Sequence, residues 1–133
     1  MPDKCVLDSS IIAAIFFQEK ASKKAVQLVQ DKDLFTVDLA IVEVANVAWK
    51  RVILFEENKD IIKEALKKSI EFINTSCEVI EMNGLIESSF KIAVKEKITV
   101  YDALFLDAAR SKKVPLYTLD KKLKIKDDVE VLN

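Results

Sequence analysis

Short apolar runs alternate with longer amphipathic segments along the chain, and this alternation limits the possible fold more than any other feature. Helical periodicity marks residues 11–17, 19–32, 39–55, 60–74, 83–96 and 100–112. We expect Ser9 or Ser10 to cap the first of these helices. Runs with the length and composition of strands fall at residues 4–7, 34–37, 77–82, 114–118 and 129–132. Strands that alternate with helices imply a parallel sheet covered on both faces. We therefore predict a three-layer α/β/α sandwich that spans residues 1–133 as a single domain.

Two residue types that many catalytic sites need are missing or scarce. The chain has no histidine and a single glycine, Gly84. Without histidine there is no Ser-His-Asp or Cys-His site, and no zinc site that needs imidazole. One glycine is too few for the Gly-rich phosphate loops of dinucleotide-binding and P-loop enzymes. An enzyme built from this chain has to use carboxylates, Lys and Arg side chains, hydroxyls and metal ions.

Charge and cysteine content favour a cytoplasmic protein. The formal net charge is −1, so no overall positive field attracts nucleic acid. The longest uncharged run, Ser9 to Gln18, is shorter than the roughly 18 apolar residues that cross a bilayer. Acidic residues flank this run, so the N-terminal segment does not resemble a signal peptide. Cys5 and Cys77 show no CxxC spacing, so we expect buried, reduced thiols and no membrane segment.

Six acidic residues interrupt strongly apolar stretches, where an unpaired carboxylate costs several kcal/mol. They are Asp8, Asp38, Glu43, Asp102, Asp107 and Asp120. Two have simple explanations. Asp38 is placed to cap the helix that follows it, and Asp107 can reach Arg110 or Ser111 one turn further along.

The other four acids are harder to dismiss. Asp8 and Asp120 follow apolar strands, so both should emerge at the carboxyl edge of the sheet. Asp102 lies in the first turn of a helix capped by Thr99, where the helix dipole alone would explain it. Propensity gives no reason for Glu43 in its apolar helix.

If these four carboxylates meet at one edge, they repel each other unless cations lie between them. Oxygen ligands without His or Cys select Mg²⁺ or Mn²⁺, and one or two such ions are the usual means of hydrolysing phosphodiesters. The open alternative is that the four are unrelated surface or capping acids.

Four short motifs, in order over nearly the whole chain, resemble the PIN-domain family and its small VapC-type ribonucleases. They are Val6-Leu-Asp-Ser-Ser10, Val42-Glu-Val-Ala-Asn46, Thr99-Val-Tyr-Asp-Ala-Leu-Phe-Leu106 and Tyr117-Thr-Leu-Asp120. The resemblance implies a parallel sheet in the order 3-2-1-4-5. It also implies that Asp8, Glu43, Asp102 and Asp120 bind metal, with the hydroxyls of Ser10 and Thr118 nearby to orient a ligand, a water or the scissile phosphate.

The same resemblance carries an activity and partners. Family members cleave RNA with Mg²⁺ or Mn²⁺ and leave a 5′-phosphate. Many are toxins held inactive by a small antitoxin protein, and many form homodimers. Asp107 departs from the family, which more often has a small or apolar residue there.

Basic and aromatic residues near the motifs are candidates for contact with RNA. Lys121 and Lys122 follow the last acid, and Lys50 and Arg51 share a helix with Glu43, although a solvated helix face explains them equally well. The aromatics Tyr101, Phe105, Tyr117 and Trp49 could stack on bases, but their apolar neighbours favour core positions.

These observations predict a metal-dependent endoribonuclease, the toxin of a toxin–antitoxin pair. A housekeeping RNA-processing nuclease and a PIN-like module that binds RNA or protein without cutting are the alternatives. A phosphoryl-transfer domain of the receiver or haloacid-dehalogenase type is disfavoured. Asp8 is followed by Ser-Ser where the latter has Asp-x-Asp, and no phosphoacceptor Asp ends the third strand.

Overall fold

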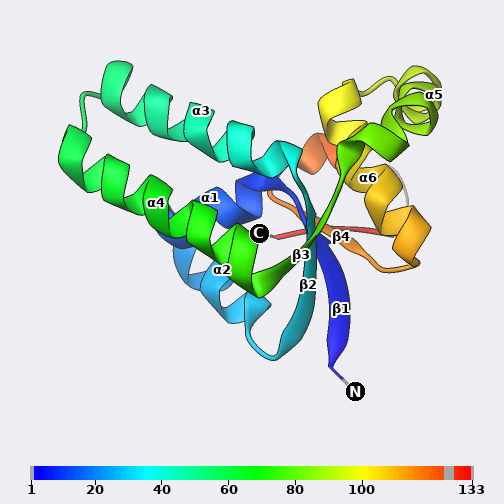
Figure 1. The fold of residues 1–133 in the computed structure, drawn as a ribbon, viewed down its shortest axis with the longest axis horizontal. Helices are drawn as coiled ribbons and strands as arrows, with labels where there is room; N and C mark the ends of the chain where they lie inside the picture. The colour runs from blue at the N-terminus through cyan, green and yellow to red at the C-terminus, as the bar shows by residue number, and fades with distance from the viewer. Residues whose placement is uncertain (1, 125–127, 133) are drawn as a thin grey trace.

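A five-stranded parallel sheet forms the centre of the computed structural model, which describes residues 2–124 and 128–132 (Figure 1). The strands are β1 (Asp3–Leu7), β2 (Lys32–Val37), β3 (Cys77–Ile80), β4 (Leu116–Thr118) and β5 (Val129–Val131). Their order is β3-β2-β1-β4-β5, and every neighbouring pair is parallel. The fold class and strand order predicted from the sequence are therefore confirmed.

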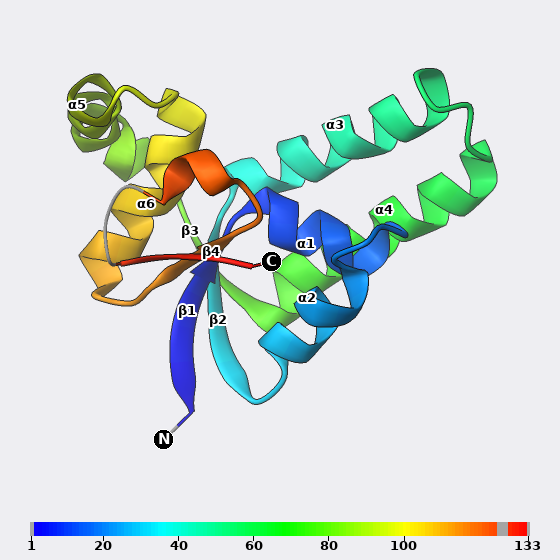
Figure 2. The same cartoon turned by 180° about the vertical axis from the view of Figure 1, so that it is seen from behind.

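Helices cover both faces of the sheet, as Figures 1 and 2 show from opposite sides. One layer holds α1 (Ser9–Phe16), α2 (Ser22–Val29), α3 (Leu39–Ile53) and α4 (Lys59–Ser76). The other holds α5 (Ile86–Glu96), preceded by the short 3-10 helix η1 (Met82–Leu85), and α6 (Val100–Lys112), which packs on β1 and β2. A second 3-10 helix, η2 (Lys121–Leu123), follows β4. No helix in the described part of the chain is long and apolar enough to cross a membrane.

The strand order reverses between β1 and β4, and this decides where a site can form. The chain moves from β1 outward to β2 and β3, then returns to the other side of β1 to form β4 and β5. Val6 and Leu7 of β1 pair with Leu116 and Tyr117 of β4. In open parallel sheets ligands bind beyond the carboxyl ends of the strands at such a switch point. The residues just after Leu7 and Thr118 lie at that position.

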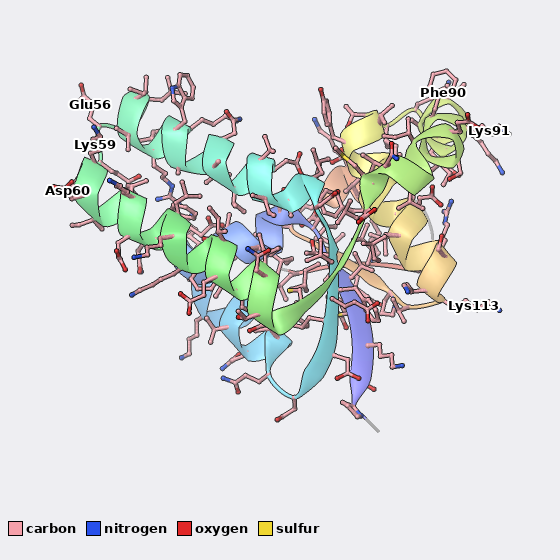
Figure 3. All side chains as sticks on the ribbon, viewed as in Figure 1. Glu56, Lys59, Asp60, Phe90, Lys91 and Lys113 are labelled. Atoms are coloured by element: carbon pink, nitrogen blue, oxygen red, sulfur yellow. The ribbon has the colours of Figure 1, made fainter. Side chains whose placement is uncertain are left out.

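The antiparallel helices α3 and α4 form an arm that extends past the sheet, with Glu56 and Lys59 near its tip (Figures 1 and 3). A small apolar cluster attaches the arm to α1: Phe17 and Ala13 pack with Ala48 and Ile62. The main core lies between sheet and helices and includes Val6, Leu7 and Phe105. Only the inner side of the arm is packed, so much of its apolar surface faces solvent.

The helix caps differ from the predictions at two positions. Thr99 caps α6 as predicted, with its hydroxyl accepting from Asp102 N at 3.2 Å. We expected a serine to cap α1, and this was wrong, since Asp8 caps it. The predicted cap at Asp38 was also wrong. Its backbone is helical, where a side chain does not reach the next turn, and it accepts from Met82 N at 3.0 Å.

Asp107 was predicted to be a surface residue or to pair with Arg110, and this was wrong. Its side chain is buried, 7% exposed, because its face of α6 packs on α5. There it accepts hydrogen bonds from Ser89 Oγ at 2.9 Å and from Ser88 Oγ. Arg110 pairs with Asp128 at 3.0 Å. Asp107 therefore fastens α5 to α6.

The two cysteines are free thiols, as predicted. Cys5 on β1 and Cys77 on β3 flank Leu34 of β2, so they lie two strands apart. Burial raises the pKa of Cys5 to about 11 and that of Cys77 to about 12. Both thiols are therefore protonated and unreactive at neutral pH.

We expect Asp107→Ala to lower the free energy of unfolding by about 1–3 kcal/mol, because it leaves the buried hydroxyl of Ser89 without its acceptor and Ser88 with only the carbonyl of Leu85. Urea denaturation measures the change. Ser111→Ala, at an exposed position on the same helix, is the matched control and should change stability by less than about 0.5 kcal/mol. Equal stability of the two variants would contradict the structural role given to Asp107.

Candidate active site

Asp8 lies at the carboxyl end of β1 and is only 6% exposed. As the cap of α1, its Oδ1 accepts from Ser10 N at 3.0 Å and from Ile11 N at 3.3 Å. Burial raises the pKa of Asp8 from 3.8 to about 6, although hydrogen bonds from Ser10 and Thr118 oppose this shift. The carboxylate is thus fixed in place by donors, while its charge is destabilised by lack of water.

The hydroxyls of Ser10 and Thr118 hold Asp8 from two sides. Ser10 Oγ donates to Asp8 Oδ1 at 2.5 Å, and Thr118 Oγ1 donates to Asp8 Oδ2. Both hydroxyls also accept from the backbone after β4: Ser10 Oγ from Leu119 N at 3.0 Å, Thr118 Oγ1 from Asp120 N at 3.1 Å. This network ties the end of β1 to the end of β4. Each hydroxyl proton is directed at Asp8, so the structure places Ser10 and Thr118 as supports of that carboxylate.

Asp120 follows β4 and is half-buried. Its Oδ1 accepts from Lys122 N at 2.9 Å, so it caps η2. The strand order of the sheet brings the backbone of Asp120 beside that of Asp8, because β1 and β4 are neighbours and both residues directly or closely follow the strand ends.

Glu43 reaches the same edge from α3. It is half-buried in the second turn, and its Oε1 accepts from Ser9 Oγ at 2.9 Å. Burial raises the pKa of Glu43, and the charge of Asp102 raises it further. The sequence analysis treated Ser9 only as a possible cap and missed this contact. The doubled serine after Asp8 is the signal that was available.

Asp102 connects the four acids electrostatically. It lies in the first turn of α6, and its pKa is raised by burial and then by the charge of Asp120. Its own charge contributes to the raised pKa values of Asp8 and Glu43. Four carboxylates from four separate segments therefore repel one another at the switch point. In Figures 1 and 2 the starts of α3 and α6 and the 3-10 helix η2 meet at that end of the sheet.

None of the four acids forms an ion pair within the described part of the chain, where the salt bridges involve other carboxylates. Nor do three or more Asp, Glu or Cys side chains there lie close enough together to enclose an ion. The carboxylates are thus close enough to interact electrostatically, but in this structure they are too far apart to coordinate one metal ion together.

The basic side chains named in the sequence analysis lie in two places. Lys121 and Lys122 are exposed on η2, directly after Asp120, and Lys50 is exposed on α3. Arg51 lies elsewhere, in the last turn of α3 toward the tip of the arm. It pairs with Glu57 at 3.1 Å and with Glu19 at 3.4 Å.

The four aromatic side chains divide in the same way. Phe105 is buried in the core and Tyr117 is half-buried on β4, as the preference for core positions implies. That preference was wrong for Tyr101 and Trp49, whose side chains are mostly exposed. An apolar neighbourhood in sequence does not reveal which face of a helix an aromatic residue occupies.

Comparisons with known proteins agree with this geometry. The pattern that describes the PIN domain matches residues 5–129. A protein of Pyrobaculum aerophilum named Ribonuclease VapC3 is 35% identical over 121 residues, covering 90% of this chain and 92% of the relative.

Solved structures share the fold. The crystal structure of another Pyrobaculum aerophilum protein superposes with a TM-score of 0.72 at 25% identity, covering 97% of this chain and 84% of that one. A toxin–antitoxin complex from Klebsiella pneumoniae gives a TM-score of 0.73 at 16% identity, with 97% and 98% covered. The Mycobacterium tuberculosis toxin VapC20, described as cleaving the sarcin–ricin loop, gives 0.69 at 17%, with 88% and 90% covered.

The PIN-domain pattern covers residues 5–129, which is nearly the whole chain. The chain therefore belongs to the PIN-domain family and is similar to its VapC-type members.

Proposed function

We propose that this protein is a metal-dependent endoribonuclease and the toxin of a toxin–antitoxin pair. The observation that carries the proposal is the convergence of Asp8, Glu43, Asp102 and Asp120 without a cationic partner in the described residues. The charge of Asp102 raises the pKa values of Asp8 and Glu43, and the charge of Asp120 raises the pKa of Asp102. Two similar proteins point to the same chemistry: one is named Ribonuclease VapC3, and VapC20 is described as a toxin that cleaves the sarcin–ricin loop.

The donor set fits Mg²⁺ or Mn²⁺. All four side chains offer hard oxygen ligands, and a divalent cation among them would offset their repulsion. The open spacing also suits Mg²⁺, which keeps several waters and takes only one or two carboxylates directly. We assign Asp8, Glu43, Asp102 and Asp120 as the residues that hold one or two ions. When bound, such an ion supplies a Lewis acid that makes water more acidic and offsets the charge of the phosphodiester.

The protein side chains then have separable tasks. Ser10 and Thr118 keep Asp8 in one orientation and keep water from it, so this carboxylate is a fixed part of the site. Ser9 holds Glu43 through Oε1. Glu43 Oε2 has no partner among the described residues, and its raised pKa suits it to take a proton from the attacking water.

The exposed lysines beside the acids supply the positive charge that RNA needs. Lys121, Lys122 and Lys50 are placed to contact phosphates on either side of the cleaved bond. Arg51 is the weakest of the four candidates, because its guanidinium is already occupied by Glu19 and Glu57.

The arm supports an antitoxin partner. Between α3 and α4 lies an open, mainly apolar groove of about 340 Å³, lined by Ala48, Trp49, Val52 and Ile62 among others. An amphipathic segment of a small protein is the kind of ligand that such a groove accepts. The Klebsiella pneumoniae structure, described as a toxin–antitoxin complex, has the same fold.

A homodimer is supported by a second apolar surface. Ile86, Phe90 and Val94 form one exposed stripe along α5, with Phe90 at the outer side of the molecule in Figure 3.

An RNA substrate and two reduced thiols are consistent with a cytoplasmic protein.

We expect Asp8→Asn to reduce RNA cleavage at least about 100-fold, since it removes charge stabilisation worth several kcal/mol. The amide oxygen still caps α1, so the protein should remain folded. Cleavage of a labelled RNA is measured with Mg²⁺, with Mn²⁺ and with EDTA, and only EDTA should stop the wild type. Glu64→Gln, at an exposed position on α4, is the control. Equal cleavage by Asp8→Asn and wild type would show that the activity is a contaminant.

The pH dependence of stability tests the burial of Asp8 directly. A carboxyl whose pKa is raised on folding favours the folded state at low pH, and this contribution is lost as pH rises through about 6. Metal-free Asp8→Asn should therefore gain on the order of 2–3 kcal/mol over wild type between about pH 4 and pH 7. Urea denaturation at each pH gives the difference. If the free energies of unfolding of the two proteins changed with pH in parallel, the pKa of Asp8 would not be raised on folding.

A further inference from the structure

A groove of about 370 Å³ opens beside Glu43, next to the cluster of acids. Helix α3 supplies Val42, Glu43, Asn46 and Lys50 along one side, and Tyr101 of α6 lies on the other. Its size is within the roughly 300–1,000 Å³ typical of small-molecule sites. Glu43 of the proposed catalytic centre thus lies at this groove, whereas Asn46 and Tyr101 have no part in the proposed function.

Tyr101 presents an aromatic ring to this groove. Its side chain is 61% exposed, in the first turn of α6, directly before Asp102. Val42, also mostly exposed, adds an apolar surface on the opposite side. An exposed ring next to an apolar side chain is a surface on which a nucleobase stacks, since every base has a π-face.

Asn46 and Lys50 extend the polar stripe that begins at Glu43. They follow it by three and seven residues, so all three side chains share one face of α3. Neither Asn46 nor Lys50 has a hydrogen bond or ion pair to another of the described residues. An amide offers a donor and an acceptor to a base edge, and an ammonium group offers charge to a phosphate.

We infer that this groove is the binding site for the nucleotide adjacent to the cleaved phosphodiester in a single-stranded RNA. The inference rests on the proposed function. The base stacks on Tyr101, Asn46 contacts its edge, and Lys50 contacts the next phosphate along the strand. Unstacked bases of this kind are available in single strands and loops but not inside a duplex.

The composition of the groove favours RNA over a protein segment as its occupant. It combines an aromatic ring with an amide, an ammonium group and the edge of an acidic site, which matches the mixed chemistry of a nucleotide. The groove between α3 and α4 is far more apolar and suits the side chains of a protein helix.

Fluorescence of a short RNA that contains 2-aminopurine tests the stacking directly. Titration in Mg²⁺, in the Asp8→Asn background, keeps binding apart from cleavage, and the RNA is checked for intactness afterwards. We expect the emission to be quenched on binding, and we expect Tyr101→Ala to remove this quenching and weaken binding by about 5- to 100-fold. Tyr101→Phe should retain both, because it keeps the ring.

Phe55→Ala is the matched control, because Phe55 is an equally exposed aromatic (66%) at the far end of α3. The helix from Glu43 to Ile53 alone spans about 15 Å, and Phe55 lies beyond its end. In proteins with an intact Asp8, Tyr101→Ala should raise KM for a single-stranded RNA by a similar factor and leave kcat within about threefold. Lys50→Ala should weaken binding of the same RNA, whereas Lys91→Ala, at an exposed lysine on α5 labelled in Figure 3, should leave it unchanged.

The outcomes separate this inference from the proposed function. Quenching that depends on Tyr101, together with a wild-type protein that cuts no RNA, would support the groove and refute the nuclease. Cleavage that is indifferent to Tyr101→Ala, with quenching unchanged, would overturn the groove and leave the nuclease standing. The groove inference would also be overturned if Tyr101→Ala weakened binding of a cognate protein partner but not binding of RNA, because the occupant of the groove would then be a protein.

Discussion

Repulsion among four carboxylates at one edge of the sheet is the constraint on which the rest of this structure depends. Asp8, Glu43, Asp102 and Asp120 come from distant segments, and Asp102 is coupled to each of the other three. A fold gains no stability from such an arrangement when each acid also loses contact with water. This cost fits the divalent-cation site proposed above, because a bound cation would offset the repulsion.

The sheet topology explains how the fold maintains the cluster. Reversal of strand order between β1 and β4 puts Asp8 and Asp120 at adjacent strand ends, and the hydroxyls of Ser10 and Thr118 connect those ends. On β2, the buried Thr36 donates to the carbonyl of Leu7 at 2.8 Å, so the last residue of β1 is held from the other side too. Asp8 and the strand ends on either side of it are thus fixed by backbone and hydroxyl contacts that do not need a metal ion to form.

Much of the fold was predictable because apolar periodicity decides it locally. The boundaries of α6, with Thr99 as its cap, follow directly from the sequence, as does the order of strands once the family is identified. Asp38 and Asp107 were misassigned for a shared reason. Each binds a partner that is distant in the chain, Met82 N for Asp38 and the hydroxyls of α5 for Asp107, whereas sequence reasoning considers neighbours within one turn.

The candidate site was predictable to a similar extent. Asp8 and Asp120 could be placed together from their positions after strands, but the contact of Ser9 with Glu43 depends on how α3 crosses the start of α1. Nor does an apolar stretch such as that around Tyr101 show that its ring is exposed beside the acids. Such facts arise from helix orientation in three dimensions, which periodicity leaves open.

Anomalous X-ray scattering from crystals grown with Mn²⁺ tests the central claim most directly. The account predicts one or two manganese peaks among Asp8, Glu43, Asp102 and Asp120, with the side chains drawn closer together than in the metal-free protein. Crystals of Asp8→Asn should lose at least one peak. Full occupancy of manganese elsewhere on the molecule, with the four carboxylates unchanged, would contradict the claim that they form a divalent-cation site.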